Sequence, residues 1–378
     1  MSSPSNVPAT AVRRGMAARI GLRLLWLGIG CVVALLLGEM VVTVLHGPTV
    51  RFPRRVVEAP WGLRYNEPNA RYWHHSPDVH VEFHINAQGM RAERDFDYAK
   101  PAGVRRIVCL GDSFTAGYEV QHEETFASVM ERELGQRGQR VEVLNAGVSG
   151  FSTAEEVLYL ERELYRYAPD CVVLSFFSND LADNLRTGLF AVESGTAVAR
   201  AERYVPLGRL GNFLNTNAVF NFLSERSNLM ALLKERVTLQ IKAKMVAENR
   251  ASEASAAGSA AVDPAQYERQ LEGALLHRLL AWCRERNILL VVQSIPESIP
   301  AGPSLRDDFP YGEFLVEQDG LLFVKCEEFL TPYLGQELLY WTRSHFHWTP
   351  FAHRLSGQRL AEVIDQAWRA APNDGAAR

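Results

Sequence analysis

Residues 105–113 read RRIVCLGDS, an apolar segment that stops at Gly-Asp-Ser. A run of Ile, Val, Cys and Leu without polar alternation is typical of a strand that is buried on both faces of a parallel sheet. The longer stretch IVCLGDSFTAGYEV (107–120) continues into a helix-like pattern. Such a strand–turn–helix junction places Ser113 at the carboxyl edge of the sheet, where α/β proteins keep their sites.

The same alternation of apolar runs and amphipathic segments repeats along the chain. Strands that alternate with helices form parallel sheets covered on both faces. The pattern therefore predicts an α/β fold, a three-layer α/β/α domain with a mainly parallel sheet over residues 104–370. The further expected strands are 141–148 (VEVLNAGV), 171–177 (CVVLSFF), 288–295 (ILLVVQSI) and 321–326 (LLFVKC), and the expected helices are 122–137, 153–168, 267–287 and 351–369.

Residues 24–45, LLWLGIGCVVALLLGEMVVTVL, form a hydrophobic run that only Glu39 interrupts. A helix of this length spans roughly 33 Å, enough to cross a bilayer. Four arginines and no acids precede it, which favours a cytoplasmic tail (1–23) and a single-pass membrane anchor with the rest of the chain in the periplasm or outside the cell. A cleaved signal peptide is the alternative, although the run is long and no small-x-small cleavage site follows it. Glu39, near one end of the run, is expected to have no specific role.

A membrane-proximal segment with short strands is predicted for residues 46–103. Within it VHVEFHIN (79–86) alternates as a half-exposed strand does. Four histidines of this segment are expected on a solvated strand face rather than in a metal site: His74, His75, His80 and His84.

An insertion interrupts the α/β domain at residues 181–265. Residues 217–246 are helical in pattern, whereas the Ala/Ser-rich stretch 248–264 is expected to be mobile. An insertion above the carboxyl edge of a parallel sheet is placed to form a lid over a site. A surface decoration or a dimer contact is the alternative reading. Residues 371–378 are predicted to be a disordered tail.

The 378-residue chain carries a formal net charge of −4, divided into +3 for residues 1–46 and −7 for the remainder. This sign argues against nucleic acid as a partner. The five cysteines lack the spacing of a disulfide framework or a zinc site, so buried free thiols are expected. We therefore expect no cofactor and no metal.

Two further strand ends carry residues suited to polar chemistry. VLNAGVSGFST (143–153) supplies glycines whose backbone N–H groups can approach a ligand closely. LSFFSNDLADN (174–184) places Asn179 after another strand, where its side-chain amide can donate to an oxyanion. Each feature taken alone also fits a helix cap, a turn glycine or an Asx turn. Their occurrence at successive strand ends predicts one site.

These motifs, in this order, resemble those of the SGNH hydrolases, also called GDSL esterases. INAQGMR (85–91) is similar to the lead-in of membrane-anchored bacterial members. The resemblance implies an SGNH, flavodoxin-like fold in which GDSFT supplies the nucleophile Ser113 and its N–H. It further implies that Gly150 of NAGVSG and Asn179 of SND complete the oxyanion hole, and that His347 is the catalytic base.

The stretch SHFHWTPFAH (344–353) departs from the family at one point. The family's base usually follows an aspartate by two or three positions, but Ser344 and His345 occupy those positions here. Three explanations stay open: another group orients His347, the site is degenerate and only binds, or the histidines hold a metal. The candidates for orienting His347 are Ser344, His345 and Glu297, the last of which follows a predicted strand.

The resemblance implies a membrane-anchored serine ester hydrolase that forms an acyl-enzyme at Ser113. The expected substrate is an ester-bearing small molecule or a glycan, most simply an O-acetyl group on a cell-surface glycan. The alternatives are a catalytically degenerate scaffold or glycan-binding protein of a polysaccharide system, and an O-acetyltransferase that uses the same site. The sequence leaves the oligomeric state open.

Overall fold

The central feature of the computed structural model is a five-stranded parallel sheet in the order β13-β10-β7-β5-β6. The structure describes residues 9–47, 50–53, 55–206, 208–256, 263–299, 304–314 and 320–370. The five strands are β5 (Arg105–Leu110), β6 (Val141–Asn145), β7 (Cys171–Phe177), β10 (Leu289–Ile295) and β13 (Leu321–Lys325). The predicted α/β fold with a mainly parallel sheet is confirmed, and each predicted strand of the sheet is present.

Helices cover both faces of this sheet, because its strands present apolar side chains alternately to either side. Ile107 and Cys109 of β5 pack towards α3 and α11, whereas Val108 and Leu110 pack towards α4, α5 and α9. The covering helices are α3 (Phe126–Gln136), α4 (Thr153–Arg162), α5 (Asn179–Thr187), α9 (Pro264–Glu285) and α11 (Pro350–Ala370). Shorter elements are α2 (Ser113–Ala116), α10 (Cys326–Leu330) and the 3₁₀ turns η1 (His122–Glu124), η2 (Leu164–Tyr167) and η3 (Thr331–Tyr333).

Two-stranded antiparallel sheets surround this core. They pair β1 (Val56–Glu58) with β2 (Arg64–Asn66), β3 (Arg71–His75) with β4 (His80–His84), β8 (Phe190–Glu193) with β9 (Thr196–Ala199), and β11 (Glu297–Ile299) with β12 (Ser304–Arg306). Residues 46–103 pack against the α/β domain, since Phe52, Tyr72 and Phe83 share an apolar cluster with Tyr118.

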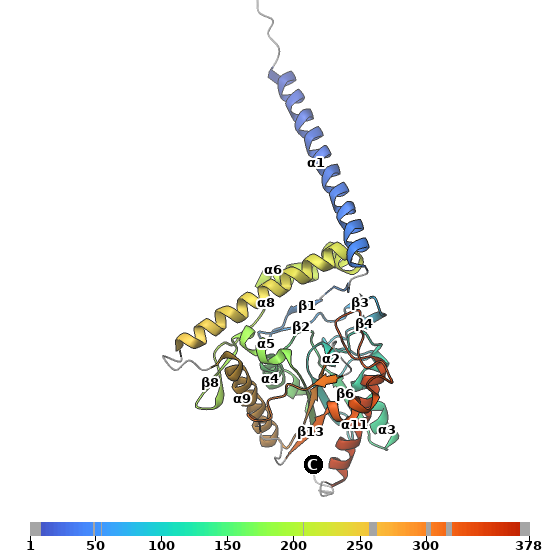
Figure 1. The fold of residues 1–378 in the computed structure, drawn as a ribbon, viewed down its shortest axis with the longest axis vertical. Helices are drawn as coiled ribbons and strands as arrows, with labels where there is room; N and C mark the ends of the chain where they lie inside the picture. Colours follow the sequence, from blue (N-terminus) through green and yellow to red (C-terminus); the bar gives the residue numbers. More distant parts are fainter. Residues whose placement is uncertain are drawn as a thin grey trace, which may run out of the picture.

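The N-terminal helix α1 (Ala9–His46) projects away from the body (Figure 1). Its portion Arg19–Leu45 has a mean hydropathy of 2.3 and is long enough to cross a membrane. The helix begins within the stretch predicted as a tail. Glu39, for which no role was expected, accepts hydrogen bonds from Ser227 Oγ (2.7 Å) and from the backbone N–H groups of Asn228 (2.8 Å) and Leu229 (3.0 Å).

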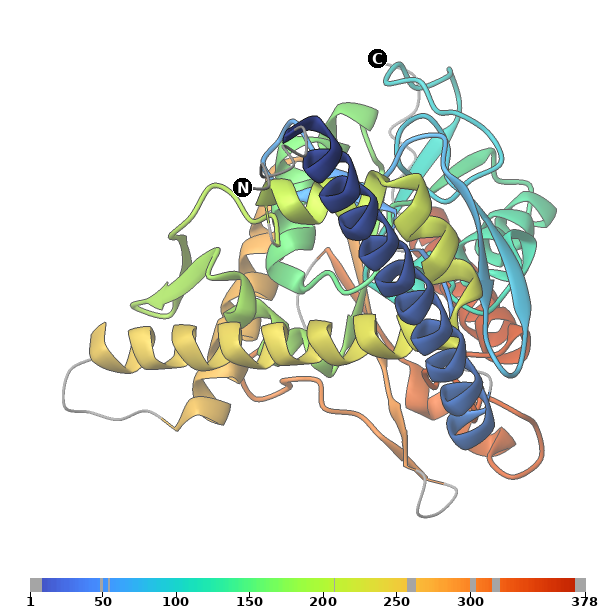
Figure 2. The same ribbon diagram turned by 90° about the horizontal axis from the view of Figure 1, so that it is seen from above.

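These bonds attach α1 to the insertion, which is largely helical. It contains α6 (Gly208–Thr216), α7 (Ala218–Arg226) and α8 (Asn228–Ala256). Helix α8 lies across the end of the body from which α1 departs, and the view from above shows the two helices running in different directions (Figures 1 and 2). The stretch 248–264, expected to be mobile, continues α8 as far as Ala256, and residues 257–262 lie outside the described residues. The predicted tail 371–378 lies outside the described residues.

Candidate active site

The sheet order brings the three candidate strand ends together. β5 lies between β6 and β7, so the turns after these three strands meet at one carboxyl edge. The register pairs Cys109 with Asn145 on one side and Leu110 with Leu174 on the other. The residues after these positions include Ser113, Gly150 and Asn179. The topology therefore supports the expectation of a single site.

Ser113 is the first residue of α2 and lies next to the imidazole of His347. Asp112 is the N-cap of this helix, and its Oδ1 atom accepts a hydrogen bond from the N–H of Phe114 at 2.9 Å. The Ser113 hydroxyl is therefore not the capping group. Nε2 of His347 lies 2.8 Å from Oγ of Ser113. The His347 ring is buried and makes edge contacts with the rings of Phe114 and Tyr118. The pair has the distance required for proton transfer.

The turn after β6 packs tightly against this nucleophile turn. Nδ2 of Asn145 donates to the carbonyl of Thr115 at 2.7 Å, and Val148 N–H donates to the carbonyl of Gly111 at 3.1 Å. A Cβ atom at Gly147 would lie 2.3 Å from the backbone nitrogen of Ala116, so only glycine permits this approach. Gly150 follows with φ +69°, a conformation that glycine adopts without strain.

Asn179 begins α5 at the end of β7 and faces the insertion. Its Nδ2 atom lies 3.4 Å from Oδ2 of Asp183, a long contact that leaves amide donor capacity for a ligand. Asp183 in turn binds Nζ of Lys242 on α8 at 3.1 Å. The insertion therefore reaches the edge of the candidate site, as the lid hypothesis proposes.

The carboxylate that lies behind His347 belongs to Glu119, which was not among the residues expected there. Its Oε2 atom lies 3.5 Å from Nδ1 of His347, at the outer limit of hydrogen-bonding distance, and its side chain is fully buried. The contact is an ion pair rather than a hydrogen bond, since Nδ1 has no hydrogen-bond partner of ideal geometry among the described residues. Apo sites often hold such contacts slightly long. Ser113, His347 and Glu119 thus form a serine–histidine–carboxylate chain.

Glu119 reaches this position through an unusual turn only six residues after the nucleophile. Its φ of +69° is rare for a residue with a side chain and costs energy that the surroundings must offset. The buried guanidinium of Arg91 donates to the carbonyls of Ala116 (2.6 Å), Gly117 and Val120 (2.6 Å). Arg91 ends the INAQGMR motif, so this lead-in holds the turn that presents the acid.

Two further side chains hold the Glu119 carboxylate. Nε2 of His74 lies 3.2 Å from Oε1, and Oγ of Ser344 donates to Oε2 at 2.7 Å. Burial acts to raise the pKa of Glu119, but the contacts with His347 and His74 outweigh it and hold the pKa well below its usual range. Burial lowers the pKa of His74, with partial compensation from Glu119. His74 is therefore a neutral donor to an ionised Glu119.

These contacts correct several expectations. His74 is buried rather than solvated, and Ser344 binds the acid instead of the His347 ring. The carboxylate of Glu297 is occupied by Ser178 and Arg306, so it is not the orienting acid.

The two remaining histidines of the motif do not form a metal site with His347. His345 is exposed, with its ring 6.0 Å from that of His347. His353 is buried on α11 and accepts from Phe126 N–H through Nδ1 at 3.2 Å. Within the described part of the chain, no group of His, Cys, Asp or Glu has the arrangement of a metal site.

Residues 109–355, more than half of the chain, match the sequence profile of the GDSL-like lipase/acylhydrolase family. The chain belongs to this family. The matched region begins within β5 and includes Ser113, Glu119, Gly150, Asn179 and His347. The resemblance inferred from the motifs is therefore confirmed at the level of the family and its fold.

Individual relatives of this GDSL-family chain are distant. An arylesterase of Vibrio mimicus is 33% identical over 75 residues, which span 20% of this chain and 38% of that enzyme. A two-domain esterase active on acetylated mannans is 12% identical, with a TM-score of 0.39, covering 73% of this chain and 53% of the other. The lipase/acylhydrolase from Enterococcus faecalis is 17% identical, with a TM-score of 0.37, covering 70% and 96%.

Proposed function

We propose that this GDSL-family chain is a serine carboxylic ester hydrolase with Ser113 as nucleophile, His347 as base and Glu119 as the orienting acid. The single observation that carries the proposal is the unbroken series of contacts from Ser113 Oγ to His347 Nε2 and from His347 Nδ1 to Glu119. A degenerate binding site has no need to keep a buried, ionised carboxylate behind a histidine, since burying a charge is costly.

The proposed reaction follows from the positions of these atoms. His347 Nε2 removes the proton of Ser113 Oγ as the oxygen attacks the ester carbonyl. The backbone N–H groups of Ser113 and Gly150 and the side-chain amide of Asn179 donate to the oxyanion. His347 then gives the proton to the departing alcohol oxygen. Water repeats the sequence on the acyl-enzyme, with His347 again as base. Glu119 holds the imidazole in the tautomer that carries its proton on Nδ1.

We propose further that α1 is an uncleaved membrane anchor with the catalytic domain on the periplasmic or outer side. Support comes from the apolar span Arg19–Leu45 and from the arginines that precede its apolar core. A signal peptide that is cleaved off would not be expected to bond to the folded body. Glu39 of α1, however, accepts hydrogen bonds from two backbone N–H groups at the start of α8. The proposed substrates are O-acyl esters carried by molecules at the membrane surface, glycans or lipids, of which the acetyl ester is the smallest.

The test is hydrolysis of p-nitrophenyl acetate and butyrate by the purified full-length chain. We expect Ser113→Ala to reduce the rate to that of buffer, and the exposed control Ser304→Ala to retain it. Equal rates for wild type and Ser113→Ala would favour the scaffold alternative. A transferase would instead turn over faster when a sugar hydroxyl acceptor is added.

A further inference from the structure

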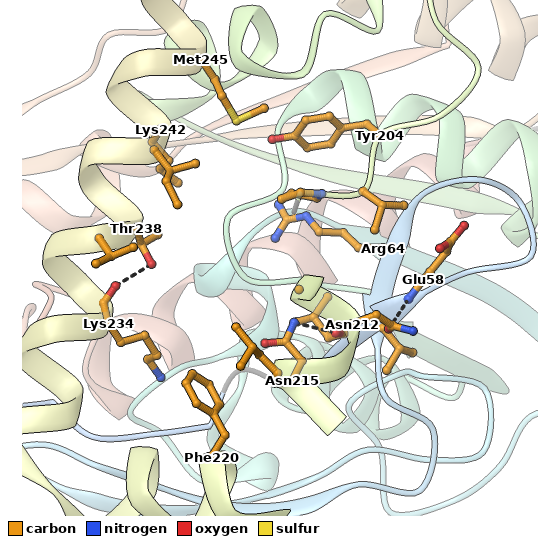
Figure 3. Close-up of a pocket in the computed structure, with 18 of the residues that line it drawn as sticks. Glu58, Arg64, Tyr204, Asn212, Asn215, Phe220, Lys234, Thr238, Lys242 and Met245 are labelled. Atoms are coloured by element: carbon orange, nitrogen blue, oxygen red, sulfur yellow. Dashed lines mark hydrogen bonds between the residues drawn. The ribbon is translucent and has the colours of Figure 1, made fainter. Parts of the chain in front are cut away.

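A cavity of about 350 Å³ lies between α8 and the surface formed by β1 and α6 (Figure 3). Its volume is within the range of about 300–1,000 Å³ usual for small-molecule sites. Neither Ser113 nor His347 is among its described lining residues. The cavity is therefore distinct from the space directly around Ser113 and His347.

Helix α8 lines this cavity with one of its faces. In Figure 3 the α8 side chains follow one another along one wall, opposite Tyr204, Arg64, Asn215 and Phe220. The cavity-lining positions recur every three or four residues, as one face of a helix does. They are Met230, Leu233, Lys234, Val237, Thr238, Ile241, Lys242 and Met245.

One end of the cavity adjoins the proposed oxyanion donors. Arg64 and Arg186 line the cavity and both donate to the carbonyl oxygen of Gly150, Arg186 at 2.9 Å. A Cβ atom built on Gly150 would lie 3.8 Å from Nζ of Lys242. Lys242 also shares Asp183 with Asn179. A chain that leaves an ester carbonyl held by Gly150 and Asn179 therefore meets the mouth of this cavity.

Each basic side chain at this end of the cavity is already paired with a carboxylate of the protein. Arg64 pairs with Glu155 at 3.0 Å, Arg186 with Asp183 at 2.9 Å, and Lys242 with Asp183 at 3.1 Å. The rest of the wall is mainly aliphatic, with Val56, Val205 and Leu214 facing the α8 side chains. Such a lining favours a hydrocarbon chain over a phosphate or another anion.

We propose that this cavity binds the acyl chain of the ester, so that the preferred substrate is a medium-chain acyl ester rather than an acetyl ester. The inference rests on the proposed ester hydrolysis and specifies its acyl group. A methylene group is close in size to a water molecule, about 30 Å³, so the cavity is large enough for an acyl chain much longer than acetyl. The alcohol part must lie near His347, which protonates it, whereas the cavity adjoins the oxyanion donors.

The position of the cavity also suits a substrate that comes from a membrane. Leu233 and Val237 line the cavity and are nevertheless about half exposed, so its rim is open. Further apolar side chains are exposed on α6 and α7, among them Phe213 and Phe222. These helices lie at the end of the body where α1 departs (Figure 1).

The test measures kcat/KM for p-nitrophenyl esters of two, four, eight and twelve carbons, using the full-length chain in phospholipid nanodiscs. Each buried methylene is expected to raise kcat/KM about three- to fourfold until the cavity is full. Ile241→Trp fills the inner part of the cavity, and we expect it to lower the eight-carbon rate at least tenfold while the acetate rate stays within twofold. Leu239→Trp, exposed on another face of α8, is the matched control and should leave the series unchanged.

A wild-type preference for acetate, or a series that Ile241→Trp leaves unchanged, overturns the acyl-chain site while the esterase proposal stands. Cross-linking to Ser113→Ala provides a readout that needs no turnover. A decanoyl ester with a terminal diazirine should cross-link to peptides within residues 230–245 in this variant, and Ile241→Trp should abolish the product. Cross-links to α1 alone overturn the site. Cross-linking at α8 without hydrolysis by wild type would retain the chain site and refute the enzyme.

Discussion

The carboxylate of Glu119 stands behind the imidazole of His347, with Oε2 3.5 Å from Nδ1 and the nucleophile on the ring's other nitrogen. The acid therefore comes from the turn that follows the nucleophile, not from the residues that precede the base. Because this turn is held by Arg91 and by Trp341, whose Nε1 donates to the Glu119 carbonyl at 3.1 Å, the acid has a fixed place. The three side chains thus stand in the order that the proposed serine triad requires.

The first prediction concerns Glu119 itself. Glu119→Gln keeps the size of the side chain but offers an N–H where His347 needs an acceptor, so the imidazole is held in the wrong tautomer. We expect kcat to fall by about 10³–10⁴ with little change in KM, as for the loss of a triad acid. Glu297→Gln is the control and should alter kcat by less than about threefold. A larger fall in kcat for Glu297→Gln than for Glu119→Gln would mean that Glu297, not Glu119, orients His347.

The second prediction concerns His74, a positioning residue that acts through Glu119. His74→Phe retains a ring beside Phe52 and Tyr118 but removes the donor to Oε1. Loss of one hydrogen bond to a charged group is expected to lower kcat about ten- to hundredfold with KM unchanged. His74→Gln should restore most of the activity. Equal losses in both variants, together with a lowered Tm, would mean that His74 serves packing alone.

From the sequence, the candidate site residues could be predicted only where they directly follow a predicted strand. The buried runs 105–110, 141–148 and 171–177 predicted the parallel sheet. The motifs after them made Ser113, Gly150 and Asn179 candidates, Gly150 through the family resemblance. Glu119 was not predicted although it stands inside the stretch IVCLGDSFTAGYEV, because the family pattern places the acid two or three positions before the base and the substitute that was expected, Glu297, follows a different strand. A signal was present: Glu119 is the first acid after Ser113, in a turn that follows a glycine.

Burial of His74 and the continuation of α8 could not be predicted, for different reasons. Alternation in β3 shows that its faces differ, but which face is buried depends on the apolar cluster that Phe52 and Tyr118 complete from distant parts of the chain. The Ala/Ser-rich stretch was interpreted from composition as a linker, although alanine has the strongest helix propensity. Contact of Asn249 with the carbonyl of Leu185 at 2.7 Å helps to hold this part of α8 in place.

The third prediction concerns the oxyanion hole. Asn179→Ala removes one proposed donor and is expected to lower kcat by about 10²–10³. Asn179→Asp keeps the size of the side chain and suits a helix start, but its charge repels the oxyanion, so it should be at least as damaging. Assays of both variants beside thermal melts separate this role from folding. Retained activity in Asn179→Asp would exclude Asn179 as a donor.

The fourth prediction concerns a buried acid beneath the site. Both carboxylate oxygens of Glu156 lack a hydrogen-bond partner among the described residues. Burial, with repulsion from Asp112 and Glu272, raises the pKa of Glu156 well above its usual range. The folded state therefore holds a proton that the unfolded state releases near pH 4.3, and stability falls as pH rises from there towards the folded pKa.

Replacement of this acid should flatten that dependence. Glu156→Gln needs no proton, so its Tm relative to wild type should rise as the pH increases from about 5 towards the folded pKa of Glu156. The free energy of unfolding of the variant should gain on that of wild type by about 1.4 kcal/mol for each pH unit between the unfolded and folded pKa values of Glu156. The measurement is scanning fluorimetry between pH 5 and pH 8. The control is Glu285→Gln, a substitution at an exposed position. A constant difference between variant and wild type would contradict the assignment.

The central claim, that Ser113 is an activated nucleophile, is tested most directly by covalent labelling with a fluorophosphonate followed by intact and peptide mass spectrometry. The account predicts one adduct per chain, located on Ser113, formed at least a hundredfold more slowly in His347→Ala and absent from Ser113→Ala. A wild-type chain that stays unlabelled, or one labelled equally well after Ser113→Ala, would contradict it.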